Sequence, residues 1–239
     1  MRRGAAVALA VFAAVGCAGD GGDDGLMVFA AASLTDVFEQ LDEDARFNFA
    51  GSDELATQLR EGAEADLYAA ASARYPRELH AEGLLWNPRV FATNRLVLIV
   101  PRSNPAAIDS LDDVDRDGVK LVIGAEGVPI GDYTRSALKS ARREGILARV
   151  VSEEEDVRGV LGKVALAEAD AGFVYATDAK AAQDDVRAIE LPASSETRVE
   201  YPIALVRGSG NVEPARRFVS RLFSAHGRRL LRQAGFGVP

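Results

Sequence analysis

Two serines stand where an apolar run gives way to a helical pattern. Ser33 follows "VFAAA" and opens "SLTDVFEQL", and Ser52 follows "RFNFAG" and opens "SDELATQL". Ile130, in "GVPIGDYTRSAL", and Val157, in "EEEDVRGVL", occupy the same kind of position. The first turn of a helix exposes unpaired backbone N–H groups and the positive end of the helix dipole. If these four helix starts converge, they form an anion-binding site that needs no cationic side chain.

Helix capping explains each serine equally well when the serine is considered singly. Ser33 and Asp36 match an S-x-x-D capping box, and Ser52 precedes Asp53 and Glu54 in a predicted first turn. A polar side chain at a helix start can cap the helix and also bind an anion. The residues alone therefore leave both roles open.

No pattern in the sequence singles out a catalytic centre. It has neither a G-x-S-x-G elbow nor an H-E-x-x-H pair, and His80 and His226 lie far apart on charged helical segments. The stretch that begins at Asp113 resembles the start of a calcium-binding loop, but Gly124 stands where the bidentate glutamate belongs. We therefore predict no enzyme activity, no cofactor and no directly coordinated metal ion. A surface-anchored hydrolase stays a distant alternative, because carboxylates are plentiful.

The charge balance restricts the partner. Asp and Glu number 36 against 28 Lys and Arg, which gives a formal net charge of −8. Because phosphate backbones require clustered basic residues, we expect no nucleic-acid partner. A small anionic ligand remains compatible, because amides and hydroxyls act at contact distance while surface charges are screened over about 10 Å.

The N-terminal segment is predicted to lie outside the folded domain. Residues 1–16 of "MRRGAAVALAVFAAVGC" have the basic start and short apolar run of a secretory signal peptide. The segment ends like the lipobox of bacterial lipoproteins, in which Cys17, the only cysteine, would receive a diacylglyceryl group; an ordinary signal peptide is the alternative. Residues 17–25 form a flexible acidic tether. We expect export and a lipid anchor on the extracytoplasmic face of a bacterial membrane.

Apolar runs alternate with amphipathic stretches over the rest of the chain. Short apolar runs predict strands, and apolar residues at helical spacing predict helices between them, which indicates an α/β fold. The predicted strands are 26–32, 46–50, 66–71, 94–100, 120–124, 171–175, 186–191 and 199–206. The predicted helices are 33–43, 54–62, 76–83, 131–144, 156–168 and 212–234.

Four blocks of sequence resemble the periplasmic molybdate-binding protein family, the substrate-binding components of molybdate ABC transporters. The blocks are "FAAASLTDVF", "FAGSDELATQLREGAEADLYAAAS", "EEEDVRGVLGKVALAEADAGFVYATDA" and "VEYPIALV". The resemblance implies a two-lobed type II periplasmic-binding-protein fold, in which each lobe is a mostly parallel sheet flanked by helices. It further implies a monomer that holds molybdate or tungstate between its lobes and works with a membrane permease.

Two crossover segments are expected to join the lobes. The predicted strand 94–100 precedes a turn-rich interval, and the predicted strand 199–206 crosses back. We expect residues 26–98 and 202–239 to form lobe 1 and residues 99–201 to form lobe 2.

The resemblance assigns five residues to the oxyanion site. Ser33 and Ser52 would supply hydroxyls and backbone amides from lobe 1. Ile130 and Val157 would supply backbone amides, and Tyr175 its phenol, from lobe 2. From its pattern alone, Tyr175 is equally well a half-buried strand residue.

The sequence departs from the family pattern beside this expected site. Asp53 and Glu54 stand where small neutral residues are commoner, and Ile130 replaces a common alanine. Carboxylates so close would repel an oxyanion unless they point outward or pair with arginine. A larger residue at 130 would narrow the pocket, although a backbone N–H donor is unaffected by its side chain.

Two further expectations concern charge and selectivity. Arg158 is expected to pair with Asp156 or Glu155 and not to contact the ligand. Tungstate, sulfate and thiosulfate remain alternatives to molybdate, because pocket volume decides among them. A sensory effector domain is the third class of function considered, and the predicted lipid anchor argues against it.

Overall fold

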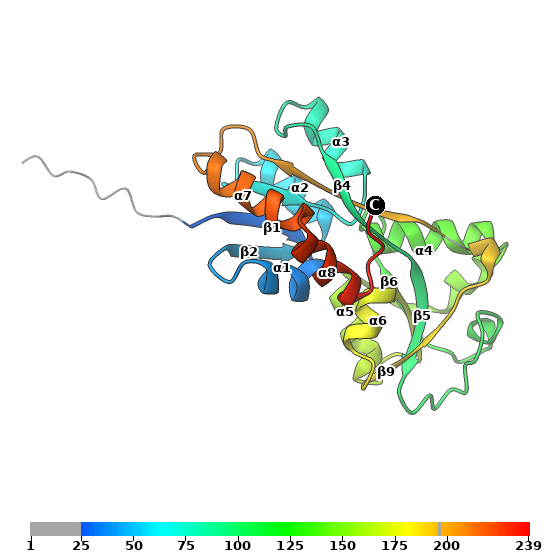
Figure 1. The fold of residues 1–239 in the computed structure, drawn as a ribbon. Coiled ribbons are helices and arrows are strands. Elements are labelled where there is room, and N and C mark those ends of the chain that lie inside the picture. The colour runs from blue at the N-terminus through cyan, green and yellow to red at the C-terminus, as the bar shows by residue number, and fades with distance from the viewer. Residues whose placement is uncertain (1–24, 196) are drawn as a thin grey trace, which may run out of the picture.

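Apolar runs pair into two five-stranded sheets that occupy different halves of the molecule (Figure 1). The structure is a computed structural model that describes residues 25–195 and 197–239. The predicted signal peptide (1–16), Cys17 and the tether up to residue 24 lie outside the described residues. We call each sheet with its helices a lobe.

The first lobe contains a sheet with the strand order β2-β1-β3-β10-β4. Strand β1 runs parallel to β2 and β3, whereas β10 runs antiparallel to β3 and β4. Its strands are β1 (Met27–Ala31), β2 (Arg46–Ala50), β3 (Leu67–Ala69), β4 (Arg89–Asn94) and β10 (Val199–Leu205). Its helices are α1 (Thr35–Leu41), α2 (Ser52–Arg60), α3 (Arg74–Ala81), α7 (Val212–Phe223) and α8 (Ala225–Ala234), with a 3-10 turn, η1 (Ala32–Leu34), before α1.

The second lobe contains a sheet with the strand order β7-β6-β8-β5-β9. Strand β6 runs parallel to β7 and β8, whereas β5 runs antiparallel to β8 and β9. Its strands are β5 (Leu96–Pro101), β6 (Leu121–Gly124), β7 (Val150–Glu154), β8 (Ala171–Tyr175) and β9 (Val186–Ile189). Its helices are α4 (Pro129–Ser140), α5 (Val157–Ala165) and α6 (Ala176–Ala181), with 3-10 turns η2 (Asp112–Asp115), η3 (Glu144–Arg149) and η4 (Ala193–Ser195).

The chain changes lobe twice. Strand β4 ends at Asn94 and β5 begins at Leu96, so only Arg95 separates strands of different sheets. The chain returns between β9 and β10. The two-lobed α/β fold expected from the sequence is confirmed, but each sheet is mixed, because β5 and β10, the first strands after each crossing, run antiparallel to their neighbours.

The sequence patterns missed three elements and merged two. Strand β7 carries acidic residues and alternates between partial and full exposure, and β4 has polar residues at both ends, so neither reads as an apolar run. Helix α6 is only six residues long. The predicted helix 212–234 is two helices, because Ser224 ends α7 and caps α8 by accepting a hydrogen bond from the Gly227 N–H at 3.2 Å.

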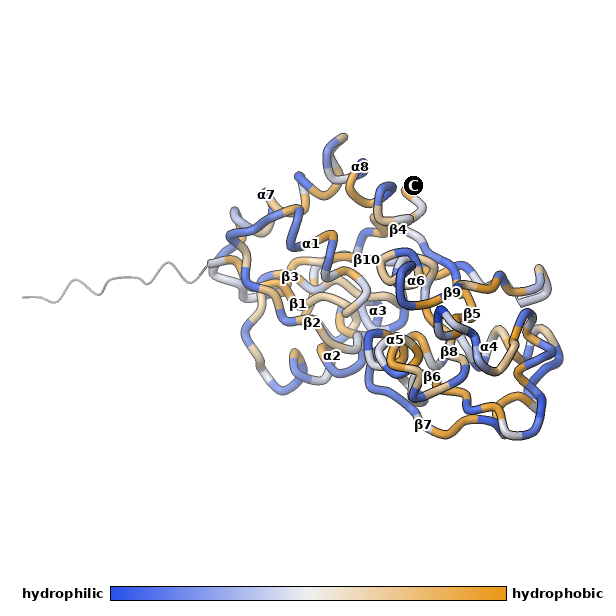
Figure 2. Tube along the Cα trace, turned by 90° about the horizontal axis from the view of Figure 1, so that it is seen from below, coloured by the Kyte–Doolittle hydropathy of each residue, from blue (hydrophilic) through white to orange (hydrophobic). Residues whose placement is uncertain are grey.

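One buried apolar cluster extends through both lobes. Figure 2 shows apolar residues concentrated along the strands, with polar residues on the outer turns of the helices. Within the cluster, the Tyr201 ring meets Phe236 edge-on at 5.2 Å between centroids and Tyr175 at 6.0 Å. Tyr201 comes from the first sheet and Tyr175 from the second, so this aromatic contact joins the lobes behind the cavity described next.

Candidate oxyanion-binding site

A small cavity lies where strand ends of the two lobes face each other. Ser33, Ser52, Ile130, Val157 and Tyr175, which the sequence singled out, all line it. Its volume is about 20 Å³, which suits a guest of a few atoms and not a sugar or a nucleotide. In open α/β sheets, ligands bind at the carboxyl ends of strands, and Ser33, Ser52 and Tyr175 lie at or just beyond the ends of β1, β2 and β8.

The two serines do not cap their helices. The N-cap positions of α1 and α2 are Leu34 and Gly51, and neither helix has a side-chain cap. Of the two roles left open for Ser33, the capping box with Asp36 does not form, because the η1 turn moves the start of α1 beyond Ser33. Both serines are buried, so their hydroxyls face the interior.

Each serine oxygen has a fixed partner inside the protein. The Ser33 Oγ lies 2.9 Å from the Tyr201 hydroxyl, and the Ser52 Oγ accepts a hydrogen bond from the Ala71 N–H at 3.0 Å. The Tyr68 hydroxyl donates to the Ser52 carbonyl at 2.6 Å and so fixes the backbone of that serine as well. These contacts hold both serines against the cavity wall.

The second lobe presents two helix N-termini. Ile130 is the second residue of α4 and Val157 the first of α5, and N–H groups so early in a helix have no i−4 partner. In α4 the first such bond is made by the Asp132 N–H to the Val128 carbonyl at 2.9 Å, which leaves the Ile130 N–H outside the ladder. Asp156 caps α5 by accepting a hydrogen bond from the Gly159 N–H at 2.9 Å.

Glycines allow α4 to approach the end of β6. A Cβ atom on Gly131 would lie 2.1 Å from the Ala125 carbonyl oxygen, and one on Gly124 would lie 2.5 Å from Cγ2 of Ile130. The Ile130 side chain therefore packs against β6 in the space that a side chain at Gly124 would occupy. This packing accommodates the larger residue at 130, which the sequence marked as a departure from the family pattern.

Tyr175 contributes the one phenol on the cavity wall. Its side chain is fully buried, and its hydroxyl has no hydrogen-bond partner within residues 25–195 and 197–239. Burial raises the pKa of the phenol well above its ordinary value, so the hydroxyl keeps its proton at neutral pH. A buried O–H donor without an acceptor is costly, and a bound oxyanion would satisfy it.

The carboxylates beside Ser52 stay off the cavity wall. Glu54 is exposed and accepts from the Gln58 amide at 3.0 Å. Burial raises the pKa of Asp53, and its Oδ1 atom has no partner among the described residues. Neither side chain lines the cavity, whose wall contains one ionisable carboxylate, Asp156, and no lysine or arginine. The Asp156 carboxylate faces the first turn of α5.

Arg158 pairs across the lobes, which corrects the sequence-based expectation. Its Nη2 atom lies 2.8 Å from Asp36 on α1, and its Nε atom lies 3.5 Å from Asp178 on α6. Among the described residues it forms no ion pair with Asp156 or Glu155, because its side chain extends toward Asp36 of the first lobe. Asp36 is 122 residues away in the sequence, so local charge patterns did not reveal this pair.

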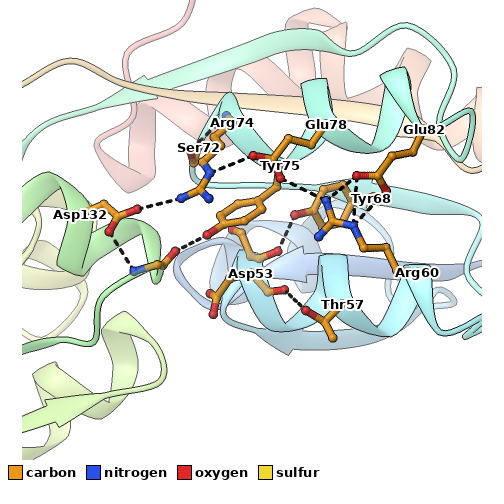
Figure 3. A network of polar contacts seen from close by, with 12 residues as sticks. Asp53, Thr57, Arg60, Tyr68, Ser72, Arg74, Tyr75, Glu78, Glu82 and Asp132 are labelled. Carbon is orange, nitrogen blue, oxygen red and sulfur yellow. Dashed lines mark hydrogen bonds and ion pairs between the residues drawn. The ribbon is translucent and has the colours of Figure 1, made fainter.

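The lobes also meet on the side of α3 (Figure 3). The Tyr75 hydroxyl of the first lobe donates to the Gly127 carbonyl of the second. Asp132 accepts from the Gly127 N–H at 2.9 Å and lies 3.6 Å from Nη1 of Arg74. Together with the pair between Arg158 and Asp36, this network holds the lobes closed around the cavity.

The described residues contain neither a metal-binding cluster nor a membrane-spanning helix. In the part of the chain that the structure covers, no group of three or more His, Cys, Asp or Glu side chains is arranged to hold a metal ion. Within the same ranges, no helix has the length and apolar character needed to cross a bilayer.

Three residues of the site region were missed by sequence reasoning. Tyr201 holds Ser33, Ala71 holds Ser52, and Gly51 lies on the cavity wall. Tyr201 falls in the block "VEYPIALV" and reads there as an ordinary strand residue. Its separation of 168 residues from Ser33 leaves no local signal for the contact.

Two mixed sheets with a small cavity between them are the architecture expected of an α/β solute-binding protein. The chain belongs to the family of bacterial extracellular solute-binding proteins, which matches residues 26–237. The molybdate-binding protein ModA of Mycobacterium tuberculosis (strain ATCC 25618 / H37Rv) is 38% identical over 224 residues, which cover 90% of this chain and 85% of that relative.

Solved structures show the same fold. The periplasmic molybdate-binding protein of Azotobacter vinelandii superimposes with a TM-score of 0.80 at 19% identity, over 90% of this chain and 99% of that one. The sulfate-binding protein SubI from Mycobacterium tuberculosis H37Rv superimposes with a TM-score of 0.75 at 17% identity, over 89% of this chain and 86% of that one.

Proposed function

We propose that this protein captures molybdate, or the nearly isosteric tungstate, between its lobes and delivers it to the permease of an ABC transporter. The observation that supports the proposal most directly is the set of hydrogen-bond donors on the cavity wall. Hydroxyls of Ser33, Ser52 and Tyr175 and the N-termini of α4 and α5 meet there, without a lysine or arginine. The 38% identity to a relative named as a molybdate-binding protein supports the choice of anion.

Molybdate matches such a wall chemically. At neutral pH it is a doubly charged tetrahedral oxyanion whose oxygens only accept hydrogen bonds, so every donor finds a partner. Hydrogen bonds to a charged group contribute about 1.5–3 kcal/mol each. Several of them, less the costs of dehydration and closure, give roughly −8 to −12 kcal/mol, which corresponds to micromolar to nanomolar binding.

Sulfate or thiosulfate is the alternative ligand within the same class. Sulfate is smaller than molybdate, and the likeness to a sulfate-binding protein concerns the fold alone. Titration calorimetry of the purified protein with molybdate, tungstate, sulfate and phosphate tests the choice. We expect heat from molybdate and tungstate only; heat from sulfate and none from molybdate would overturn the assignment.

Closure links binding to transport in this proposal. The donors come from both lobes, so only the closed form satisfies the ligand fully. The ligand therefore shifts an opening and closing equilibrium about the two crossings, one of them at Arg95, and the permease recognises the closed form. The boundaries expected from the sequence, residues 26–98 with 202–239 and residues 99–201, fall a few residues inside β5 and β10, so the lobes proposed to move divide at Arg95 and between β9 and β10.

A lipid anchor completes the proposal. Residues 1–16 would be removed on export and Cys17 acylated, which would place a monomer on the extracytoplasmic face of the membrane. Labelled fatty acid supplied to a bacterial host should enter the wild-type protein and not Cys17→Ser. Absence of label from the wild-type chain would contradict the anchor and leave the binding proposal intact.

A further inference from the structure

Helices α7 and α8 carry a charge opposite in sign to that of the whole chain. Residues 212–239 contain a single acidic side chain, Glu213, whereas acidic side chains outnumber basic ones in the complete sequence, 36 to 28. The same segment holds six exposed arginines: Arg216, Arg217, Arg221, Arg228, Arg229 and Arg232. A protein with a formal net charge of −8 therefore has one strongly basic segment.

The two helices present their arginines on the same side of the first lobe. Phe218 and Leu222 of α7 and Leu231 of α8 are buried in one apolar cluster, so the opposite side of each helix faces away from that cluster. Helices α7 and α8 also contact each other (Figure 1). We call four of the exposed arginines the basic face: Arg217, Arg228, Arg229 and Arg232.

The basic face has no ionic partner among the described residues. Arg221 pairs with Asp42 at 2.8 Å and Arg216 approaches Glu213 at 4.0 Å, but the four arginines of the basic face form no ion pair within residues 25–195 and 197–239. In α8, two of them, Arg228 and Arg232, lie four residues apart, a spacing at which like charges destabilise a helix. This arrangement costs stability in the isolated protein, and an external anionic surface would offset the cost.

Helix α1 is the neighbour that could supply counter-charge. It contacts α8 and carries Asp36 and Glu39, with Asp42 directly after it. Asp36 and Asp42 are already paired with arginines outside the basic face, Arg158 and Arg221. Of these three carboxylates only Glu39 is left against four arginines, so α1 does not neutralise the basic face.

The position of the basic face favours a membrane surface as its partner. Gly25, the first described residue, and Asn211, the N-cap of α7, line the same surface cavity, so the chain enters the fold beside the start of α7. If Cys17 is acylated as proposed, eight residues join it to Gly25, and eight residues span at most about 28 Å. The basic face is then held close to the bilayer, where each arginine strengthens binding to an anionic surface about fivefold.

We propose that the basic face docks the first lobe onto anionic phospholipid headgroups of the membrane that carries the lipid anchor. The inference rests on the anchor in the proposed function and adds an orientation to it. Helices α7 and α8 lie against the headgroups, and the second lobe stays free to open and close. Guanidinium groups bind phosphate through paired N–H donors, so arginines suit such a surface. The same surface repels the acidic remainder of the protein, which restricts docking to this side.

Sedimentation with vesicles tests this docking without the lipid anchor. The mature chain, residues 17–239 with Cys17→Ser, is mixed at low salt with vesicles of phosphatidylglycerol or of phosphatidylcholine. We expect this parent chain to bind only phosphatidylglycerol and to be released by about 0.5 M salt. Replacing two arginines of the basic face, Arg228→Gln with Arg232→Gln, should weaken binding by at least about tenfold.

A charge-matched control comes from the second lobe. Arg102 and Arg142 are exposed there and form no ion pair among the described residues. The double variant Arg102→Gln with Arg142→Gln changes the net charge by the same amount and should bind phosphatidylglycerol like the parent chain. Equal losses in the two double variants would overturn the inference, because the effect would then be one of overall charge.

Other outcomes of the same experiment also decide the question. No binding to phosphatidylglycerol, or equal binding to both lipids, would overturn the inference. Retention on immobilised polyglutamate without binding to vesicles would overturn it as well and assign the basic face to an acidic protein segment. Molybdate affinity should be unchanged in every variant, so a failure of docking leaves the proposed binding function intact. A parent chain that binds vesicles but no molybdate would refute that function alone.

Discussion

Gly51 and Glu155 lie on opposite lobes and approach so closely that no side chain fits between them. A Cβ atom on Gly51 would come within 2.5 Å of the Glu155 carbonyl oxygen. The backbone angles of Gly51, φ −59° and ψ 139°, are ones that any residue adopts. Such a Cβ would also lie 2.8 Å from Oδ1 of Asp53, the end of a side chain in the same lobe. The absent side chain therefore serves close packing, above all against the backbone of the other lobe, and not a special backbone conformation.

Gly51→Ala should consequently impair closure without harming the fold. The added methyl group separates the lobes and keeps the donors of the two walls apart, so we expect molybdate affinity to fall by tenfold or more, about 1.4 kcal/mol at least. Titration calorimetry measures the affinity, and thermal unfolding of the ligand-free protein should be nearly unchanged. Gly162→Ala, where a Cβ meets nothing within 4 Å, is the matched control and should bind like the wild type.

The serine hydroxyls should each contribute to binding. Ser33→Ala and Ser52→Ala remove one donor to a charged ligand, and each should weaken molybdate binding by about 1–3 kcal/mol. Ser52→Ala should also lower the free energy of unfolding, because the Ala71 N–H loses its acceptor. Calorimetry and urea denaturation separate the two effects. Wild-type affinity in both variants would remove these serines from the site.

The Tyr75 hydroxyl joins the lobes only when they are closed. Tyr75→Phe deletes its bond to the Gly127 carbonyl, so the closed form should lose about 0.5–1.5 kcal/mol relative to the open form. We expect molybdate to dissociate several-fold faster, measured by stopped-flow fluorescence, with association little changed. Arg60, which pairs with Glu78 and Glu82 within the first lobe, offers a control: Arg60→Gln should leave dissociation unaffected. Equal rates for Tyr75→Phe and wild type would show that this contact does not hold the closed form.

Asp178 should make stability depend on pH. Burial raises its pKa from an ordinary value near 3.8 to about 7, and the charge of Arg158 lowers it only in part, because the pair at 3.5 Å is not hydrogen-bonded. The folded state then retains a proton that the unfolded state releases. This contribution to stability is fully present below about pH 4 and is lost as the pH rises through about 7.

Asp178→Asn should remove that dependence. The unfolding temperature of the wild-type protein should fall between pH 5 and pH 8 by more than that of the variant, which stays neutral throughout. Differential scanning calorimetry across this range measures both. Parallel curves would show that Asp178 is ionised in the folded protein at all these values of pH.

Local patterns predicted most of the fold because most elements carry their own signal. Apolar runs such as "LVLIV" and helix starts such as Asp156 are read within a few residues. The pattern failed where an element is short or exposed, as for α6 and β7. It also merged α7 with α8, because a single serine cap interrupts the helix without breaking the apolar spacing.

The same distinction between local signals and long-range contacts applies to the candidate site. Ser33, Ser52, Ile130 and Val157 were found because a helix start is visible in sequence, and the structure places them with Tyr175 around one cavity. Contacts between distant segments were not found. The contact of Tyr201 with Ser33 joins residues that are 168 positions apart, and the contact of Asp36 with Arg158 joins residues that are 122 positions apart. Only the folded chain brings these residues together.

The most direct test is to locate the bound metal atom. Crystals of the protein grown with molybdate, measured at the molybdenum absorption edge, reveal the position of molybdenum through its anomalous scattering. We expect one strong peak in the cavity, within reach of the hydroxyls of Ser33, Ser52 and Tyr175. A peak elsewhere, or an empty cavity in protein saturated with molybdate, would contradict the account.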